Sequence, residues 1–278
     1  MITLSTLITW IIFAIIIIML LPKAPTPIKM FIFVIGVGAI AMFFLPYLIF
    51  RPRDYRNCLG PTWVCKHFSR LLGITMEVRG LENIRRNHGS VVIMNHQSAL
   101  DLTAIAHIWP LIGNITTIAK KELLYIPFFG LGLWLSGFLF IDRKNRNQSI
   151  NIMNQESKAI HERQCKILIF PEGTRNSNEI LLPFKKGAFY MAVQSQCPIQ
   201  PIVVTHFTWL YQKSWRINHA IIHIMPEIST ENYSKENVND LLQLCQKTMQ
   251  DEYDKLNSEI KQMNMIENNK YFDDAKNK

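Results

Sequence analysis

The stretch that decides the fold reads Val91-Val92-Ile93-Met94-Asn95-His96-Gln97-Ser98-Ala99-Leu100-Asp101. It opens as an apolar run of the β type, and the apolar periodicity of a helix begins at Leu102. The chain therefore passes from a strand to a helix through a turn that carries His96 and Asp101. Ser98 and Asp101 have the spacing of a capping pair, in which the acid leans back toward the chain entering the helix. We predict a His96–Asp101 pair on a strand-to-helix turn.

Such a pair has a defined chemical use. The carboxylate fixes the tautomer and orientation of the imidazole and stabilises the imidazolium that forms when the ring takes a proton. Because no serine nucleophile motif lies nearby, the proton would come from a substrate hydroxyl. The alternative is a histidine that is merely satisfied by its helix cap. For an isolated H-x4-D pattern this alternative is favoured, since short motifs match by chance.

Composition indicates a membrane-associated protein. The chain has 278 residues, a formal net charge of +9 and 49% hydrophobic residues. A basic chain fits nucleic acid, an anionic membrane surface or anionic substrates, and the apolar first fifty residues favour the membrane. The five cysteines are an odd number without paired metal spacing, so we expect free thiols in a reducing compartment.

Two apolar spans are predicted at the N-terminus, at residues 2–22 and 30–50. Each is close to the roughly 20 residues that cross a bilayer. Arg51, Arg53 and Arg56 follow the second span and place the next domain on the cytosolic side. The two spans would then form a transmembrane hairpin. One span with one interfacial segment is the alternative, because the short linker also carries two lysines.

The rest of the chain alternates strand-like and helical segments, which predicts an α/β domain. We divide the chain into a membrane anchor at 1–56, a catalytic domain at 57–262 and a polar tail at 263–278. Catalytic groups in such sheets gather on loops at the carboxyl ends of strands. We therefore expect the loops after three β-type runs to converge on one cleft.

Residues 123–141 form a long apolar stretch interrupted by one proline and three glycines. The interruptions argue against a third membrane span. The segment is either a buried helix and strand or an apolar wall for a lipid chain, and both interpretations can hold together.

Cationic residues in three loops are candidates for anion binding. Arg175 follows Glu172-Gly173-Thr174, where Gly173 permits a tight turn and the guanidinium matches phosphate geometry. Glu172 is expected either to hold that guanidinium or to meet a substrate hydroxyl. Taken alone, each cation is more often a solvated loop charge. The other candidates are Arg143, Lys120 and Lys121.

The sequence lacks the motifs of several other enzyme classes. The chain has no G-x-S-x-G elbow and no Walker-type loop. His161-Glu162 has no second histidine at metal spacing, and the remaining histidines form no zinc pattern. We expect no metal, no redox cofactor and no nucleic-acid partner, and no obligate protein partner can be predicted.

Four segments occur in a fixed order along the chain: Asn95-His96-Gln97-Ser98-Ala99-Leu100-Asp101, Phe140-Ile141-Asp142-Arg143, Phe170-Pro171-Glu172-Gly173-Thr174-Arg175 and Pro198-Ile199-Gln200-Pro201-Ile202. They resemble the four ordered motifs of the glycerolipid acyltransferase family, and most closely its branch that acylates lysophosphatidic acid. The resemblance implies an α/β fold of the glycerol-3-phosphate acyltransferase type, with a mixed sheet flanked by helices. The predicted transmembrane helical hairpin would precede it.

The resemblance also implies a reaction. His96 would be the general base that takes the proton from the sn-2 hydroxyl of lysophosphatidic acid, and Asp101 would orient it. The activated oxygen would attack the thioester of acyl-CoA, a co-substrate, and give phosphatidic acid and CoA without an acyl-enzyme. The implied substrate-binding residues are Lys120, Lys121, Arg143, Glu172, Gly173, Thr174 and Arg175.

Two alternatives remain open: an acyltransferase with another acceptor, such as glycerol 3-phosphate or a lysophospholipid, and a non-catalytic membrane scaffold that binds lipid. The predicted spans and thiols suggest a phospholipid-biosynthesis enzyme in the endoplasmic reticulum membrane, with its catalytic domain facing the cytosol. Its partners would be acyl-CoA, lysophosphatidic acid and the bilayer.

Overall fold

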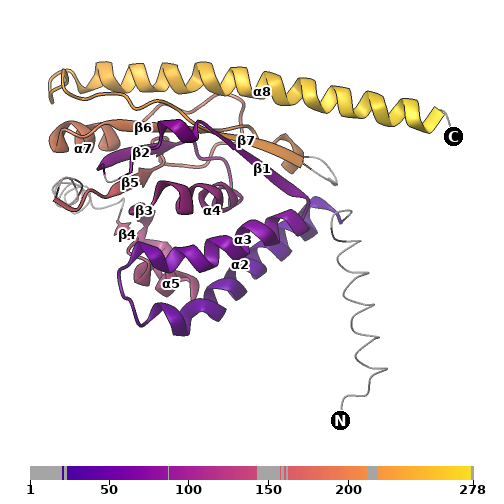
Figure 1. The fold of residues 1–278 in the computed structure, drawn as a ribbon, viewed down its shortest axis with the longest axis horizontal. Helices are drawn as coiled ribbons and strands as arrows, with labels where there is room; N and C mark the ends of the chain where they lie inside the picture. The colour runs from indigo at the N-terminus through magenta and orange to yellow at the C-terminus, as the bar shows by residue number, and fades with distance from the viewer. Residues whose placement is uncertain are drawn as a thin grey trace, which may run out of the picture.

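A mixed sheet lies at the centre of the protein (Figure 1). The computed structural model describes residues 21, 24–86, 88–142, 157, 160, 162–211 and 218–276. In that part of the chain seven strands form one sheet, in the order β1-β7-β6-β2-β5-β3-β4. The strands are β1 (Ile74–Arg79), β2 (Ser90–Met94), β3 (Ile115–Lys120), β4 (Leu139–Ile141), β5 (Lys166–Ile169), β6 (Ile199–Val204) and β7 (Asn218–Ile224).

Strand direction sets where the functional loops can meet. All neighbouring strands pair in parallel except β6 and β7, which are antiparallel. Strands β6, β2, β5, β3 and β4 therefore run the same way and end at one edge of the sheet. The predicted α/β fold with a mixed sheet flanked by helices is confirmed.

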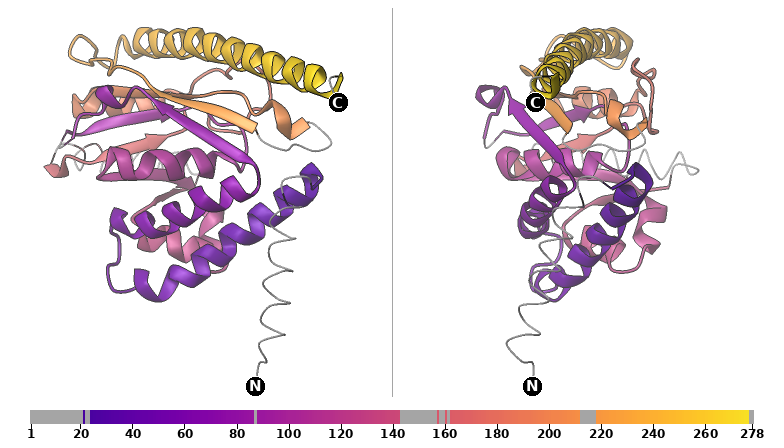
Figure 2. Two further views of the ribbon diagram at one scale, coloured as in Figure 1. Left: turned by 45° about the vertical axis from the view of Figure 1, so that its right-hand side comes forward. Right: turned by 90° about the vertical axis from the view of Figure 1, so that its right-hand side faces the viewer.

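Helices cover both faces of the sheet. Figure 2 shows α8 on one face, while α2, α3 and α4 lie on the other. The helices are α2 (Thr26–Leu48), α3 (Leu59–Leu71), α4 (Asp101–Ile112), α5 (Phe129–Leu135), α7 (Gly187–Ser195) and α8 (Val238–Lys276). Short 3-10 turns are η2 (Tyr55–Cys58), η3 (Leu81–Asn83), η4 (Lys121–Tyr125) and η5 (Thr208–Tyr211).

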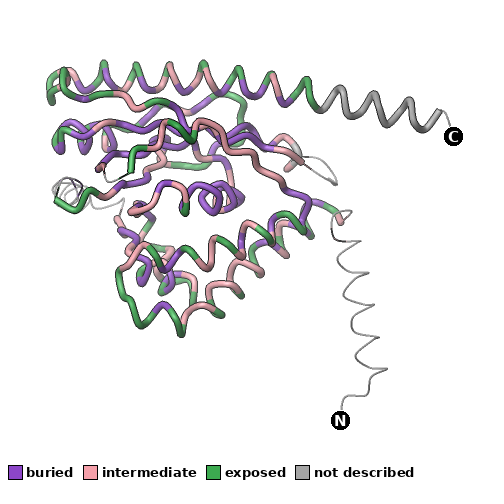
Figure 3. Tube along the Cα trace, in the orientation of Figure 1, coloured by how far each residue is buried: buried purple, intermediate pink, exposed green. Residues whose placement is uncertain are grey.

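The central strand β2 joins two hydrophobic cores. Successive side chains of a strand point to opposite faces. Val92 and Met94 therefore pack in the cluster with α3 and α4, whereas Val91 and Ile93 pack in the cluster with α7 and α8. Figure 3 shows that buried residues concentrate in the strands and in α4. A strand buried on both faces reads as a continuous apolar run, which is why β2 was predictable.

Helix α8 buries the apolar stripe that its sequence predicts. The buried side chains are Val238, Leu241, Cys245, Met249, Tyr253, Leu256 and Ile260. Leu242, also predicted on this face, is only partly buried. The helix continues to Lys276, through most of the predicted polar tail at 263–278.

Helix α2 is part of the folded domain. Phe33 is buried and stacks on Phe68 of α3 with ring centroids 6.5 Å apart. Gly36 lies so close to the Phe68 ring that a β-carbon there would come within 2.4 Å of it. The domain boundary predicted at residue 56 would thus separate α2 from a helix against which it packs.

In place of the predicted transmembrane hairpin, the described residues contain one apolar N-terminal helix. Among the described residues, α2 alone is long and apolar enough to cross a membrane. It begins at Thr26, four residues before the predicted start, with Pro27 in its first turn, where the missing N–H costs nothing. The first predicted span, 2–22, lies outside the described residues except for Leu21.

Helix α4 carries a buried histidine. The Nδ1–H of His107 donates to the carbonyl of Thr103 at 2.7 Å, and Nε2 is buried without a hydrogen-bond partner among the described residues. Burial lowers the pKa of His107 below 6.5, and the positive charges of Lys66 and Arg70 on α3 lower it further. Protonation would place an unpaired charge between two helices.

Acidification should therefore destabilise the protein through His107. Below about pH 6.5 the unfolded chain binds a proton that the folded chain excludes, so the free energy of unfolding falls as the pH falls. Thermal unfolding in detergent, measured at about pH 7.5 and about pH 5, tests this. His107→Gln should lose less of its melting temperature on acidification than the wild type. The control is His67→Gln, at an exposed position on α3; equal losses in wild type and His107→Gln would contradict the prediction.

Candidate active site

The predicted site residues that the structure describes lie at one edge of the sheet. Strands β2, β5 and β3 are neighbours and parallel. His96 lies two residues beyond the end of β2, Lys120 is the last residue of β3, and the segment from Pro171 to Arg175 follows β5. The predicted convergence of loops thus follows from the strand order. Arg143, after β4, lies outside the described residues.

His96 and Asp101 form the predicted pair. The Nδ1 atom of His96 lies 2.6 Å from Oδ2 of Asp101. Their side chains are 19% and 4% exposed, respectively. A carboxylate accepts hydrogen bonds only, so Nδ1 carries a proton. The other ring nitrogen, Nε2, is then left as the basic atom.

The Asp101 carboxylate also organises the turn itself. The same Oδ2 atom accepts the backbone N–H groups of Gln97 (2.8 Å) and Ser98 (3.2 Å). The capping arrangement differs from the predicted one: α4 begins at Asp101, and Ser98 Oγ accepts from the N–H of Leu100 at 3.0 Å. Asp101 reaches back to His96 from the first helical residue rather than from the third.

Two amides tie this turn to β6. Asn95 exchanges two hydrogen bonds with the backbone of Val204, at 2.9 and 2.8 Å. Gln97 donates to the carbonyl of Thr205 at 3.0 Å and accepts the N–H of Phe207 at 3.0 Å. Both side chains are buried. The residues on either side of His96 are therefore fixed to the strand on one flank.

Glu172 ties the same turn to the loop after β5. Its Oε1 accepts the N–H of His96 at 2.8 Å, and its Oε2 accepts the N–H of Leu182 at 2.9 Å. Burial raises the pKa of this carboxyl, while the N–H groups of His96 and Leu182 oppose that rise. The N–H of Asn176 in turn donates to the carbonyl of His96 at 2.8 Å. Arg175 therefore lies one residue from a direct contact with His96.

Phe170 orients the imidazole from a third side. Its ring stacks on that of His96, with centroids 4.0 Å apart and planes inclined by 26°. The stacking and the Asp101 hydrogen bond together restrict rotation of the His96 ring.

The cationic residues around this turn reach solvent. Arg175 and Thr174 are exposed, and Gly173 adopts φ +69°, which a residue with a β-carbon rarely takes. The side chain of Lys185 crosses Gly173 so closely that a β-carbon there would lie 2.7 Å from the lysine Nζ. Lys120 is exposed and Lys121 half-buried. An anion can therefore approach the loop beside His96.

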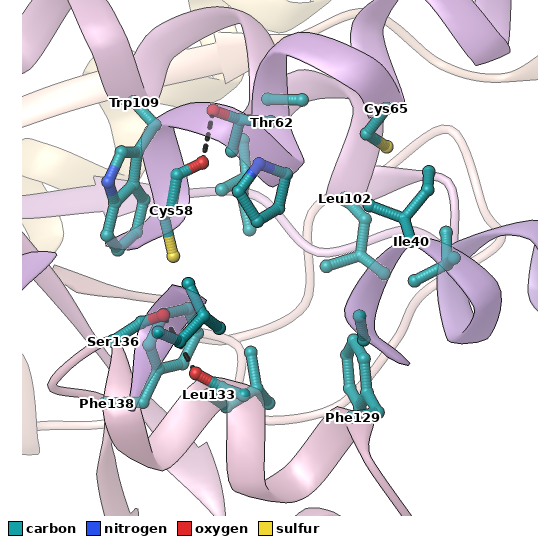
Figure 4. Close-up of a pocket in the computed structure, with 17 residues that line it drawn as sticks. Ile40, Cys58, Thr62, Cys65, Leu102, Trp109, Phe129, Leu133, Ser136 and Phe138 are labelled. Atoms are coloured by element: carbon teal, nitrogen blue, oxygen red, sulfur yellow. Dashed lines mark hydrogen bonds between the residues drawn. The ribbon is translucent and has the colours of Figure 1, made fainter. Parts of the chain in front are cut away.

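An apolar cavity of about 100 Å³ lies beside α4 (Figure 4). Leu102, the residue after Asp101, lines it, and so does Trp109, two turns along the helix and roughly 10 Å away. The hydroxyls of Thr62 and Ser136 bond carbonyls of their own helices, so the walls stay apolar. Further lining residues are Val37, Ile40, Ala41, Leu48, Cys58, Pro61, Cys65, Ile105, Ala106, Phe129, Gly132, Leu133 and Phe138.

Comparison with known proteins identifies the family. The model of the Acyltransferase family matches residues 75–205. The alpha form of 1-acyl-sn-glycerol-3-phosphate acyltransferase from Homo sapiens is 36% identical over 202 residues, which cover 72% of this chain and 71% of that protein. The Haemophilus influenzae enzyme of the same name is 35% identical over 212 residues, covering 74% and 87%. The chain belongs to the 1-acyl-sn-glycerol-3-phosphate acyltransferase family.

Membership of this family confirms the predicted class and reaction: an acyltransferase of phospholipid biosynthesis that forms phosphatidic acid from lysophosphatidic acid. The fold agrees with it. The crystal structure of PlsC from Thermotoga maritima, described as a 1-acyl-sn-glycerophosphate acyltransferase, superposes with a TM-score of 0.63 at 21% identity. The match covers 83% of this chain and 97% of PlsC.

Three positions of this acyltransferase site were not predicted as functional. Asn95 and Gln97 lie inside the first motif. The only sequence signal for a role in the site is that these two amide side chains flank His96. Phe170 is the first residue of the third motif and gives no signal beyond its aromatic type. Within the described residues no group of three or more histidine, cysteine, aspartate or glutamate side chains is arranged to hold a metal.

Proposed function

We propose that His96 is the general base for acyl transfer from acyl-CoA to the sn-2 hydroxyl of lysophosphatidic acid. The observation that carries the proposal is the 2.6 Å contact between His96 Nδ1 and Asp101, which leaves Nε2 as the basic atom of a side chain that is 19% exposed. Nε2 takes the hydroxyl proton as the oxygen attacks the thioester carbonyl. The C–S bond then breaks, and the departing thiolate of CoA takes the proton back from the imidazolium.

Asp101 stabilises the charged form of the base. The imidazolium exists only after the proton has moved, so its attraction to the carboxylate is stronger in the transition state than in the ground state. The carboxylate is 4% exposed, which reduces screening by water. No acyl-enzyme is required, because the acceptor hydroxyl attacks the thioester directly.

The acceptor's phosphate binds the cations of the surrounding loops. Arg175 is the first candidate, because the N–H of the next residue, Asn176, bonds the carbonyl of His96. Lys120 or Lys121 and Arg143 complete the set in our proposal, and the exposed hydroxyl of Thr174 lies beside Arg175. Glu172 and Gly173 shape this loop rather than face the phosphate, since both Glu172 oxygens accept backbone N–H groups.

The cavity beside α4 suits an acyl chain. Its lining includes Leu102, the residue after Asp101, and Trp109, two turns further along α4. Apolar walls bind a hydrocarbon chain by removing it from water. Burial raises the pKa of the lining thiols, Cys58 to about 12 and Cys65 to about 11, so both stay protonated and apolar in character.

Helix α2 is expected to lie at the membrane surface. Phe31, Met42, Phe43 and Phe50 on α2 and the turn after it are 53% to 83% exposed, while the opposite side of the helix packs on α3. This arrangement favours the interfacial alternative for the second predicted span, with the first span as the anchor. We place the enzyme in the endoplasmic reticulum membrane with its site facing the cytosol.

The acceptor is tested with a panel of substrates and labelled acyl-CoA. Purified protein should acylate lysophosphatidic acid in preference to glycerol 3-phosphate and to lysophospholipids with a head group. His96→Ala should reduce the rate at least roughly 10²-fold, the low end for general-base catalysis, whereas His67→Ala should retain activity. A preference for glycerol 3-phosphate, or full activity in His96→Ala, would contradict the proposal.

Arg175→Ala should mainly raise the KM for lysophosphatidic acid. Loss of a charge-assisted hydrogen bond of about 1.5–3 kcal/mol corresponds to a rise of roughly 10- to 100-fold. The matched control is Arg85→Ala, which lies before β2 at the opposite edge of the sheet and whose side chain is 72% exposed. An unchanged KM in Arg175→Ala would remove this residue from the phosphate site.

A further inference from the structure

The loop that carries Arg175 has almost no secondary structure of its own. Residues 171–186, here called the acceptor loop, run from the end of β5 to the start of α7. A segment of this length needs partners for its backbone N–H groups wherever it is buried. Its binding geometry therefore depends on which side chains supply those partners.

Two glutamines of α8 supply them in the second half of the acceptor loop. Gln250 Oε1 accepts the N–H of Leu181 at 2.9 Å, and Gln246 Oε1 accepts the N–H of Phe184 at 3.1 Å. The glutamines are four residues apart and thus lie on one face of the helix, one turn from each other. Met249 between them is fully buried and fixes this stretch of α8 on the domain.

The same part of the loop is bonded to its first half. Between the two glutamine contacts, the N–H of Leu182 donates to Glu172, whose other oxygen accepts the N–H of His96. The N–H of Lys185 donates to the carbonyl of Pro171 at 2.8 Å. A continuous set of hydrogen bonds therefore runs from α8 through the acceptor loop to the catalytic turn.

The far side of the acceptor loop is braced by the same helix. Lys261 pairs with Glu179 at 2.9 Å. Asn257 accepts the N–H of His206 at 2.7 Å, and the His206 ring bonds the carbonyl of Ser177 at 3.0 Å. Residues 246, 250, 257 and 261 fall on one helical face. Helix α8 thus supports the acceptor loop both around residues 177–179 and around residues 181–184.

We propose that Gln246 and Gln250 are positioning residues that set the acceptor loop for phosphate binding. The inference rests on the proposed function, in which Arg175 of this loop binds the acceptor. Both glutamines lie outside residues 75–205, the part matched by the family model. They act through the loop backbone and do not touch substrate.

The experiment measures steady-state kinetics of Gln246→Ala, Gln250→Ala and the double variant in the full chain. The matched control is Gln243→Ala, which makes the same change at an exposed position of the same helix. Losing two acceptors should raise the KM for lysophosphatidic acid roughly tenfold in the double variant. The KM for acyl-CoA should stay within about twofold of the wild type, since the loop that the glutamines hold is assigned to the acceptor and not to the donor.

A conservative variant separates positioning from folding. Gln246→Glu keeps an acceptor oxygen for the N–H of Phe184. Its KM for lysophosphatidic acid should therefore return most of the way from the raised value of Gln246→Ala to that of the wild type. Position 250 is unsuited to this test, because the Gln250 amide donates to Asp254 at 2.8 Å and a carboxylate there would be repelled. Melting temperatures of all variants are measured alongside the kinetics.

Two results would overturn the inference. In the first, the KM for lysophosphatidic acid in the glutamine variants equals that of Gln243→Ala. In the second, both KM values and kcat change in proportion to the melting temperature, without rescue by Gln246→Glu. Failure of the proposed function is distinguishable, because the wild type itself would then not acylate lysophosphatidic acid.

Discussion

A single oxygen atom, Oδ2 of Asp101, holds together the turn between β2 and α4, which we propose is catalytic. It accepts hydrogen bonds from the His96 ring and from the N–H groups of Gln97 and Ser98. One charge thus shapes the backbone between strand and helix and sets the tautomer of His96. Because helix α4 starts at Asp101, the position of the carboxylate is fixed by the packing of the whole helix. The turn is further held by β6 through Asn95 and by the acceptor loop through Glu172.

Two different environments, one cationic and one apolar, adjoin this turn. Neighbouring parallel strands deliver the acceptor loop and Lys120 to the same edge as His96. On the other side, α4 leads from Asp101 into an apolar cavity. The cationic loops and the hydrocarbon-lined cavity are therefore both tied to this turn, the loops through the strand order and the cavity through α4. The two environments suit a substrate with a phosphate at one end and an acyl chain at the other.

The sequence predicted the elements with strong periodicity and the motif residues. Strands β2 and β6 were predictable because their apolar runs are buried on both faces. Helix α8 was predictable because apolar residues recur on one face every three or four positions. The His96–Asp101 pair followed from the spacing at a helix start. Its capping geometry was less predictable, since helix ends depend on local hydrogen bonds that several registers can satisfy.

Long-range contacts could not be predicted in the same way. The acid Glu172 and the cation Arg175 have no sequence signal that says which one turns inward, and the structure buries Glu172 against backbone N–H groups. The contacts of Gln246 and Gln250 join residues more than 60 positions apart. The packing of α2 on Phe68 is similar: an apolar helix reads as a membrane span whether lipid or protein covers it.

The most direct test of the account is the rate of acyl transfer by Asp101→Asn. Asparagine keeps an oxygen that can accept from His96, Gln97 and Ser98, but it removes the charge that stabilises the imidazolium. The account predicts that kcat falls at least roughly 10²-fold, while both KM values stay within about twofold of the wild type. A variant that keeps the wild-type kcat would contradict the assignment of this pair as the catalytic base.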